Sequence, residues 1–240
     1  KYADGETADG AGPADPMLGN RELSDRTGLP KPTVSRLTYT LSCMGYLAPA
    51  GHYGKYQLGS AVLSLGHPLL GQFTALRRQA RPLMLDLADA TGGTVAIGIR
   101  DRLSVVYIEV ARSWSKRVYP IEVGSSLSLA GTAVGRAVLM SCRQNEREAL
   151  INQLQVKAPD EWRHHGARLM ENVQQFSRHG CCVALGEIFA DVQAVAVPLG
   201  PINRGEPAAI NLSVQGREIN EDWLRREIAP QLQAIARQLS

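Results

Sequence analysis

The feature that most constrains the fold is a pair of short helical segments joined by a glycine turn near the start of the chain. Leu23 and Val34 are apolar where two crossing helices would touch, and Ser24 is small enough to let the second helix pass close by. Gly28 tolerates the positive φ that the turn requires. This interior predicts a helix-turn-helix.

The flanking residues extend the same prediction. Asn20 is expected to cap the first helix, and the second is expected over about 32–44, with Gly45 ending it. Leu29 and Leu37 are expected to seal the underside of the pair. Short strands over 46–48 and 55–58, around a long tip, predict the hairpin of a wing.

The outer face of the second helix is basic and rich in hydroxyls. Within 20–60, five Lys and Arg stand against two Asp and Glu, so this segment alone carries +3, the net charge of the whole chain. Arg reads guanine through two hydrogen bonds, whereas Lys and hydroxyls more often hold phosphate. The candidate DNA-contacting residues are Arg21, Lys31, Thr33, Ser35, Arg36, Tyr39 and Lys55. The alternative is a plain helical hairpin with a solvated face.

The remainder of the chain mixes helices and strands. Apolar residues recur at helical spacing and predict that residues 61–91 are largely helical. The helix is expected to break near Gly66–Pro68 and at Pro82. Helices are expected over 132–142, 146–154 and 160–179, and a last one after a cap at Asn220. Strands are expected over 95–99, 105–110, 118–123, 194–199 and 208–214, paired as hairpins. The pattern predicts an α+β domain with an antiparallel sheet.

Composition excludes several classes. The longest apolar runs are far shorter than the roughly 18 residues of a membrane helix. The four cysteines fit no zinc spacing, so neither a metal nor a cofactor is expected, and unpaired thiols favour the cytoplasm. Neither a nucleophile elbow nor a phosphate loop is present. A thiol enzyme using Cys181 or Cys182 with His179 and Glu187 remains the least favoured alternative.

A second candidate site lies at the start of the helix expected from 132. Free main-chain N–H groups at Gly131–Ala133 favour an anion such as a carboxylate. Apolar and hydroxyl side chains from other parts of this domain are expected to complete a small binding pocket. The competing readings are that Thr132 only caps the helix and that Glu187 is a turn or capping residue. The candidate effector-binding residues are Ser126, Leu127, Ser128, Leu129, Gly131, Thr132, Ala133, Leu185, Glu187, Ala194, Asn211 and Ser213.

From Asn20 onward the chain resembles the IclR family of bacterial transcription regulators. The residues that carry this resemblance are 22–37, 45–47 and 56–59 in the head, then 123–137 and 180–198 further on. The resemblance implies a winged helix-turn-helix, a linker helix and a GAF-like effector domain, assembled as a dimer or a dimer of dimers. Two departures stand out: a regular first helix normally precedes the helix-turn-helix, and a His normally stands where Ser128 is.

These observations together predict a ligand-responsive, cytoplasmic regulator that binds double-stranded DNA at a palindromic operator and takes a small organic, possibly aromatic, acid as effector. No membrane partner and no catalysis are expected. The expected organisation is a flexible lead-in (1–19), the winged head (20–60), a linker helix (61–91) and an effector-binding domain (92–240). A ligand-binding or dimerisation module without DNA binding is the competing reading.

Overall fold

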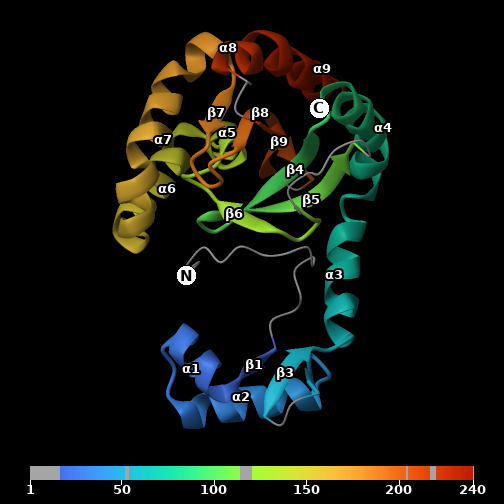
Figure 1. Ribbon diagram of the computed structural model, residues 1–240, viewed down its shortest axis with the longest axis vertical. Helices are drawn as coiled ribbons and strands as arrows, with labels where there is room; N and C mark the ends of the chain where they lie inside the picture. Colours follow the sequence, from blue (N-terminus) through green and yellow to red (C-terminus); the bar gives the residue numbers. More distant parts are fainter. Residues whose placement is uncertain (1–16, 52–53, 114–120, 204, 217–219, 240) are drawn as a thin grey trace. The chain divides into compact units, whose positions relative to one another are not determined.

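The computed structural model describes residues 17–51, 54–113, 121–203, 205–216 and 220–239 (Figure 1). The chain divides between Gln72 and Phe73 into two compact units. Most of the predicted lead-in, the tip of the wing hairpin at 52–53, and the first half of the strand predicted over 118–123 lie outside the described residues.

The first unit is a helix-turn-helix with a small antiparallel sheet. Gly28 takes φ 71°, and its N–H donates to the Ser24 carbonyl at 2.9 Å, which closes the first helix and makes the turn. The three strands are ordered β1-β3-β2, so the wing hairpin is present. The elements are β1 (Leu18–Gly19), α1 (Asn20–Thr27), α2 (Lys31–Cys43), β2 (Leu47–Pro49), β3 (Lys55–Leu58) and α3 (Ala61–Gly71).

Two expectations about the start of the head are wrong. The N-cap of α1 is Gly19, not Asn20, because the Glu22 carboxylate turns back to accept the Gly19 N–H at 2.7 Å. Asn20 instead accepts a hydrogen bond from Thr38 of α2, which ties the two helices together. Leu18 and Gly19, expected to belong to a structureless lead-in, pair with β3 as a short strand.

The underside of the helix pair is open rather than sealed. Leu29 and Leu37 are 38% and 47% exposed. They border an apolar cavity of about 390 Å³ within this unit, which Leu23 and Val34 also line. Val34 is nevertheless buried against α1, so the expected wedge between the helices is present.

The helical segment after the head is interrupted at a different place from the one predicted. Helix α3 continues through Pro68, and α4 (Thr74–Thr91) continues through Pro82. The interruption falls at Gln72–Phe73, where Phe73 is 1% exposed because its ring is drawn into the core of the second unit.

The second unit is built on a six-stranded, wholly antiparallel sheet, which confirms the predicted α+β class (Figure 1). The strand order is β6-β5-β4-β9-β8-β7. Its strands are β4 (Thr94–Asp101), β5 (Ser104–Arg112), β6 (Ser126–Ser128), β7 (Cys182–Leu185), β8 (Val192–Ile202) and β9 (Glu206–Gln215). Its helices are α4, α5 (Ala133–Ser141), α6 (Gln144–Lys157), α7 (Pro159–His179), α8 (Glu221–Trp223), a π-helical turn (Leu224–Ile228) and α9 (Ala229–Leu239).

Several local predictions are confirmed and some are wrong. Asn220 caps its helix through its side-chain oxygen, and α7 ends at His179, with Gly180 in the left-handed conformation. Ile121–Val123, the described part of one predicted strand, is not extended into the sheet, and its place beside β5 is taken by β6. Strand β7 was not predicted.

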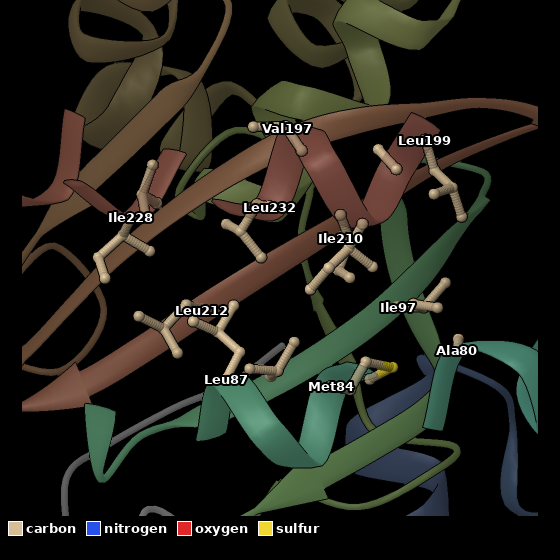
Figure 2. Packing of buried hydrophobic residues seen from close by; sticks show 14 of the residues in the cluster. Ala80, Met84, Leu87, Ile97, Val197, Leu199, Ile210, Leu212, Ile228 and Leu232 are labelled. Atoms are coloured by element: carbon tan, nitrogen blue, oxygen red, sulfur yellow. The ribbon is translucent and has the colours of Figure 1, made fainter. Parts of the chain in front are cut away.

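Two hydrophobic cores lie on opposite faces of this sheet. On one face, large aliphatic side chains of β4, β8 and β9 pack against α4 and α9 (Figure 2). Ile97, Ile210 and Leu212 contribute to this core from the strands, and Met84 and Leu232 from the helices. The alternation of side chains along each strand sends the intervening residues to the other face.

The second face is lined by small residues, which lets α5 approach closely. Ala96, Ala196 and Ala209 of the central strands face this helix. A Cβ at Gly98 would lie 3.2 Å from the Val134 side chain, and one at Gly135 would lie 2.3 Å from the Leu129 carbonyl. The start of α5 is therefore held deep against the sheet.

Candidate functional site

The outer face of α2 presents the predicted DNA-contacting side chains. Val34 and Thr38 are buried one turn apart and fix the inner face of the helix. The residues on the remaining sides are therefore turned outward. Lys31, Ser35, Arg36 and Tyr39 are exposed and Thr33 is half-buried.

Two further basic candidates lie outside α2. Arg21 is exposed on α1, and Lys55 is half-buried on β3. The Lys55 ammonium lies 3.8 Å from the Glu22 carboxylate. The Gly19 N–H and, to a smaller extent, Lys55 lower the pKa of Glu22, so that carboxylate stays charged and offsets part of the positive charge at this edge of the head.

A small cavity in the second unit gathers many of the predicted effector-binding residues. It has a volume of about 50 Å³ and lies between the start of α5, the sheet, and the loop after β7. The predicted residues that line it are Leu127, Gly131, Thr132, Ala133, Glu187, Ala194, Asn211 and Ser213. The lining residues that were not predicted are Tyr107, Ile121, Val134, Ala184, Ile188, Phe189 and Val192.

Four predicted effector-binding residues lie elsewhere. Leu129 is fully buried in the core around α5, and Leu185 is exposed at the end of β7. Ser126 pairs with Val106 in the edge strand. Ser128 is occupied structurally, because its hydroxyl donates to Glu161 and accepts the Gly131 N–H.

The start of α5 is held in place by its cap. The Thr132 hydroxyl accepts the Gly135 N–H at 3.0 Å and donates to the Ser128 carbonyl at 2.7 Å. The competing reading of Thr132 as a cap is therefore correct, although the residue also lines the cavity. The predicted N–H of Gly131 is taken by the Ser128 hydroxyl at 2.7 Å, whereas the first N–H groups of a helix have no partner within the helix itself.

Beside the cavity lies a buried ion pair that sequence reasoning missed. Arg136, in the middle of α5, is fully buried. It donates to the Ala130 carbonyl at 2.8 Å and the Val183 carbonyl at 2.7 Å, and both its terminal nitrogens reach the Glu187 carboxylate. Because the pair is charge-balanced, Glu187 borders the cavity without leaving a net charge there.

His165 of α7 completes this side of the site. Its Nδ1 lies 3.8 Å from the Glu187 carboxylate. Burial lowers the pKa of His165 below its usual value, against the attraction of Glu187, so the imidazole is neutral near pH 7. A Cβ on Gly131 would lie 3.0 Å from the ring, which shows how tightly the ring packs on the loop before α5.

The cysteines of the second unit are poor nucleophiles. Cys142, Cys181 and Cys182 are buried. Burial raises the pKa of the Cys142 thiol to about 11 and that of Cys182 to about 12, and it raises the pKa of Cys181 as well. A thiol must ionise to attack, so these environments disfavour the thiol chemistry considered from the sequence.

Two features are absent from the described residues. No group of three or more His, Cys, Asp or Glu side chains there could hold a metal ion. Within the same ranges, no helix is both long and apolar enough to cross a bilayer.

Both units match models of one protein family. Residues 12–50 match the IclR helix-turn-helix domain, and residues 72–240 match the C-terminal domain of bacterial IclR transcriptional regulators. The second match alone spans more than half of the chain.

Individual relatives agree with the family models. The chain is 34% identical over 225 residues to the HTH-type transcriptional regulator TsaQ1/TsaQ2 of Comamonas testosteroni, covering 93% of this chain and 81% of that one. A crystal structure of an IclR family regulator from Brucella abortus is 36% identical, with a TM-score of 0.81 over 93% of this chain and 84% of that one. An IclR homologue from Microbacterium hydrocarbonoxydans, complexed with 4-hydroxybenzoate, shares the fold at 19% identity, with a TM-score of 0.63 and 92% of each chain covered.

Proposed function

Since the chain belongs to the IclR family of helix-turn-helix transcriptional regulators, we propose that it binds an operator through α2 and a small organic acid in the cavity beside α5. The observation that carries the proposal is the presence of two separate sites in two compact units. One is a basic, outward-facing helix, and the other is a small cavity at a helix start.

The DNA-contacting surface is proposed to be the outer face of α2 with help from α1 and the wing. Arg36 reads a base edge, and Lys31, Ser35 and Arg21 hold phosphates. Thr33, Tyr39 and Lys55 lie at the margins of this surface. Salt titration tests the assignment, because phosphate contacts make affinity fall steeply as ionic strength rises.

The effector site is proposed to be the cavity at α5. The free N–H groups at the helix start favour a carboxylate, and the apolar walls bury the remainder of the ligand. A relative of the same fold is complexed with 4-hydroxybenzoate, which supports an organic acid as the ligand class. Ser126, Ser128, Leu129 and Leu185 are not part of this proposed site.

We propose that the active form is at least a dimer. Helix α3 contains no Asp, Glu, Lys or Arg, and Leu65 and Leu69, which lie one turn apart on the same side of the helix, are 60% and 50% exposed. A second copy of the same helix is the occupant that suits this uncharged apolar face, because a two-fold interface is self-complementary. A dimer would place two heads on a palindromic operator. Sedimentation of a Leu65→Ser, Leu69→Ser double variant would show a monomer.

The proposed organisation follows from these roles. The head is 20–60, 61–91 is the linker, and 92–240 is the effector-binding domain. Effector binding would shift operator occupancy only through a difference in its affinity for two arrangements of the heads. The regulator is proposed to act in the cytoplasm, where its DNA target lies, and without enzymatic activity.

The experiment that tests the proposal separates the two sites. Ala194→Phe places a ring in the cavity, and Ala167→Phe on the exposed face of α7 serves as the matched control. Operator affinity should be the same in both variants. Stabilisation by small carboxylates in a thermal-shift screen should be lost only in Ala194→Phe. Equal stabilisation of the two variants would place the effector elsewhere.

A further inference from the structure

The cavity contains one polar side chain with an unmet hydrogen bond. Asn211 lies on β9, between Ala96 of β4 and Ala196 of β8, and its side chain is directed to the α5 face of the sheet. It is 2% exposed. The Asn211 side chain hydrogen-bonds to the Tyr107 hydroxyl, whereas its Oδ1 accepts no hydrogen bond from any residue within the described ranges.

A buried amide oxygen without a donor is costly. Leaving it unpaired costs about 1–3 kcal/mol relative to a satisfied group. Cavities that retain such a group in a native protein are commonly completed by a ligand or water that supplies the donor. Asn211 therefore indicates that the natural occupant of this cavity donates a hydrogen bond to Oδ1.

The other polar groups around the cavity are already paired. Glu187 is held by Arg136, Thr132 is occupied as the cap of α5, and the Ser213 hydroxyl donates to the Thr94 carbonyl at 3.4 Å. The ligand carboxylate is left with the main-chain N–H groups at the start of α5, a helix of nine residues. The ligand's hydrogen-bond donor and its carboxylate are thus recognised by two different elements, β9 and the start of α5.

The size of the cavity limits the ligand further. Its volume of about 50 Å³ corresponds to roughly four water positions at about 10–15 Å³ each. Benzoate has nine non-hydrogen atoms and lactate has six, so a short aliphatic acid suits this small volume better than an aromatic acid does.

We propose that the effector is a short aliphatic hydroxy acid whose hydroxyl donates to Asn211 Oδ1 while its carboxylate binds the start of α5. This inference rests on the proposed function and specifies the ligand class of that site. Asn211 is the residue that distinguishes the hydroxy acid from the acid without the hydroxyl.

The test compares matched pairs of ligands on the full chain. The pairs are lactate with propionate and 3-hydroxybutyrate with butyrate, and 4-hydroxybenzoate with benzoate is the aromatic pair. Calorimetric titration should show at least one aliphatic hydroxy acid binding about tenfold more tightly than its partner, as expected for one hydrogen bond to a buried acceptor. In Asn211→Leu, which keeps the volume and removes the acceptor, that preference should disappear.

The outcomes separate this inference from the proposed function. Binding of aliphatic acids with no preference for the hydroxyl, in the wild-type protein, would overturn the role of Asn211 and leave the effector site intact. Tighter binding of the aromatic pair would overturn the size argument. Failure of every acid to bind would contradict the effector site itself. The wild-type comparison is decisive by itself even if Asn211→Leu does not fold.

Discussion

Arg136 and Glu187 are 51 residues apart in the sequence and meet as an ion pair beside the cavity, with the arginine side chain fully buried. The same guanidinium also holds the Ala130 and Val183 carbonyls. One side chain thereby joins the loop before α5, strand β7 and the loop after it, which are three of the segments that surround the cavity.

Removing this guanidinium should destabilise the second unit. Arg136→Met leaves Glu187 and two carbonyls without their donor, and breaking a buried pair in this way costs about 3–5 kcal/mol. Urea unfolding followed by circular dichroism measures the loss. Arg163→Met is the control, because its pair with Asp160 is 71% and 83% exposed and should contribute nothing measurable. Similar midpoints for the two variants would contradict a structural role for Arg136.

Replacing Arg36 should affect DNA binding and nothing else. Its side chain is exposed on the outer face of α2, so Arg36→Ala removes no packing. Affinity for a duplex selected from a random pool should fall about 5- to 150-fold, the range for one arginine–guanine pair. Fluorescence anisotropy measures this, with Arg178→Ala on α7 as the control for charge. An unchanged preference among duplexes would refute the base-reading role.

The protein should become less stable in mild acid because of His165. Burial holds its folded-state pKa below the unfolded value, so the unfolded chain binds the proton more readily. Stability is therefore full above about pH 6.5 and falls as the pH drops below that value. In His165→Gln, the loss of thermal stability between pH 7 and 5.5 should be smaller than in the wild type. His164→Gln, at the exposed neighbouring position, should follow the wild type.

Thiol labelling should distinguish one cysteine from the other three. Cys43 is exposed at the end of α2, whereas Cys142, Cys181 and Cys182 are buried with raised pKa values. At pH 8, one thiol per chain should react rapidly with a disulfide reagent, and the others should react only in denaturant. Cys43→Ser should remove the rapid phase. A rapid phase that survives in this variant would show that a buried thiol is accessible.

Sequence reasoning was most accurate where structure depends on neighbouring residues. The turn at Gly28, the cap at Asn220 and the end of α7 after His179 were all predicted, and the cap at Thr132 was the competing reading of that residue. Each is decided by main-chain preferences within a few residues. The residue pattern likewise predicted the helix-turn-helix and the antiparallel sheet, and both are confirmed.

The hydrogen-bond and ion-pair partners of the polar side chains in the second unit were not predictable in this way. Tyr107 and Asn211 meet because β4 lies between β5 and β9, an order that the chain sequence does not state. In the sequence, Arg136 is indistinguishable from an ordinary solvated arginine. Its burial follows only from the packing of α5 against the sheet and α7. The exposure of Leu29 and Leu37 was likewise not predictable, because it depends on which residues pack against these two side chains.

Sequence alone therefore determined the local elements, the basic face of α2 and the family, because these are written in periodicity, turn residues and short motifs. Only the tertiary structure decided which polar side chains are paired and which is left facing a cavity. The physical reason is that burial and hydrogen bonding across a sheet depend on strand order and register, which bring together residues far apart in the chain.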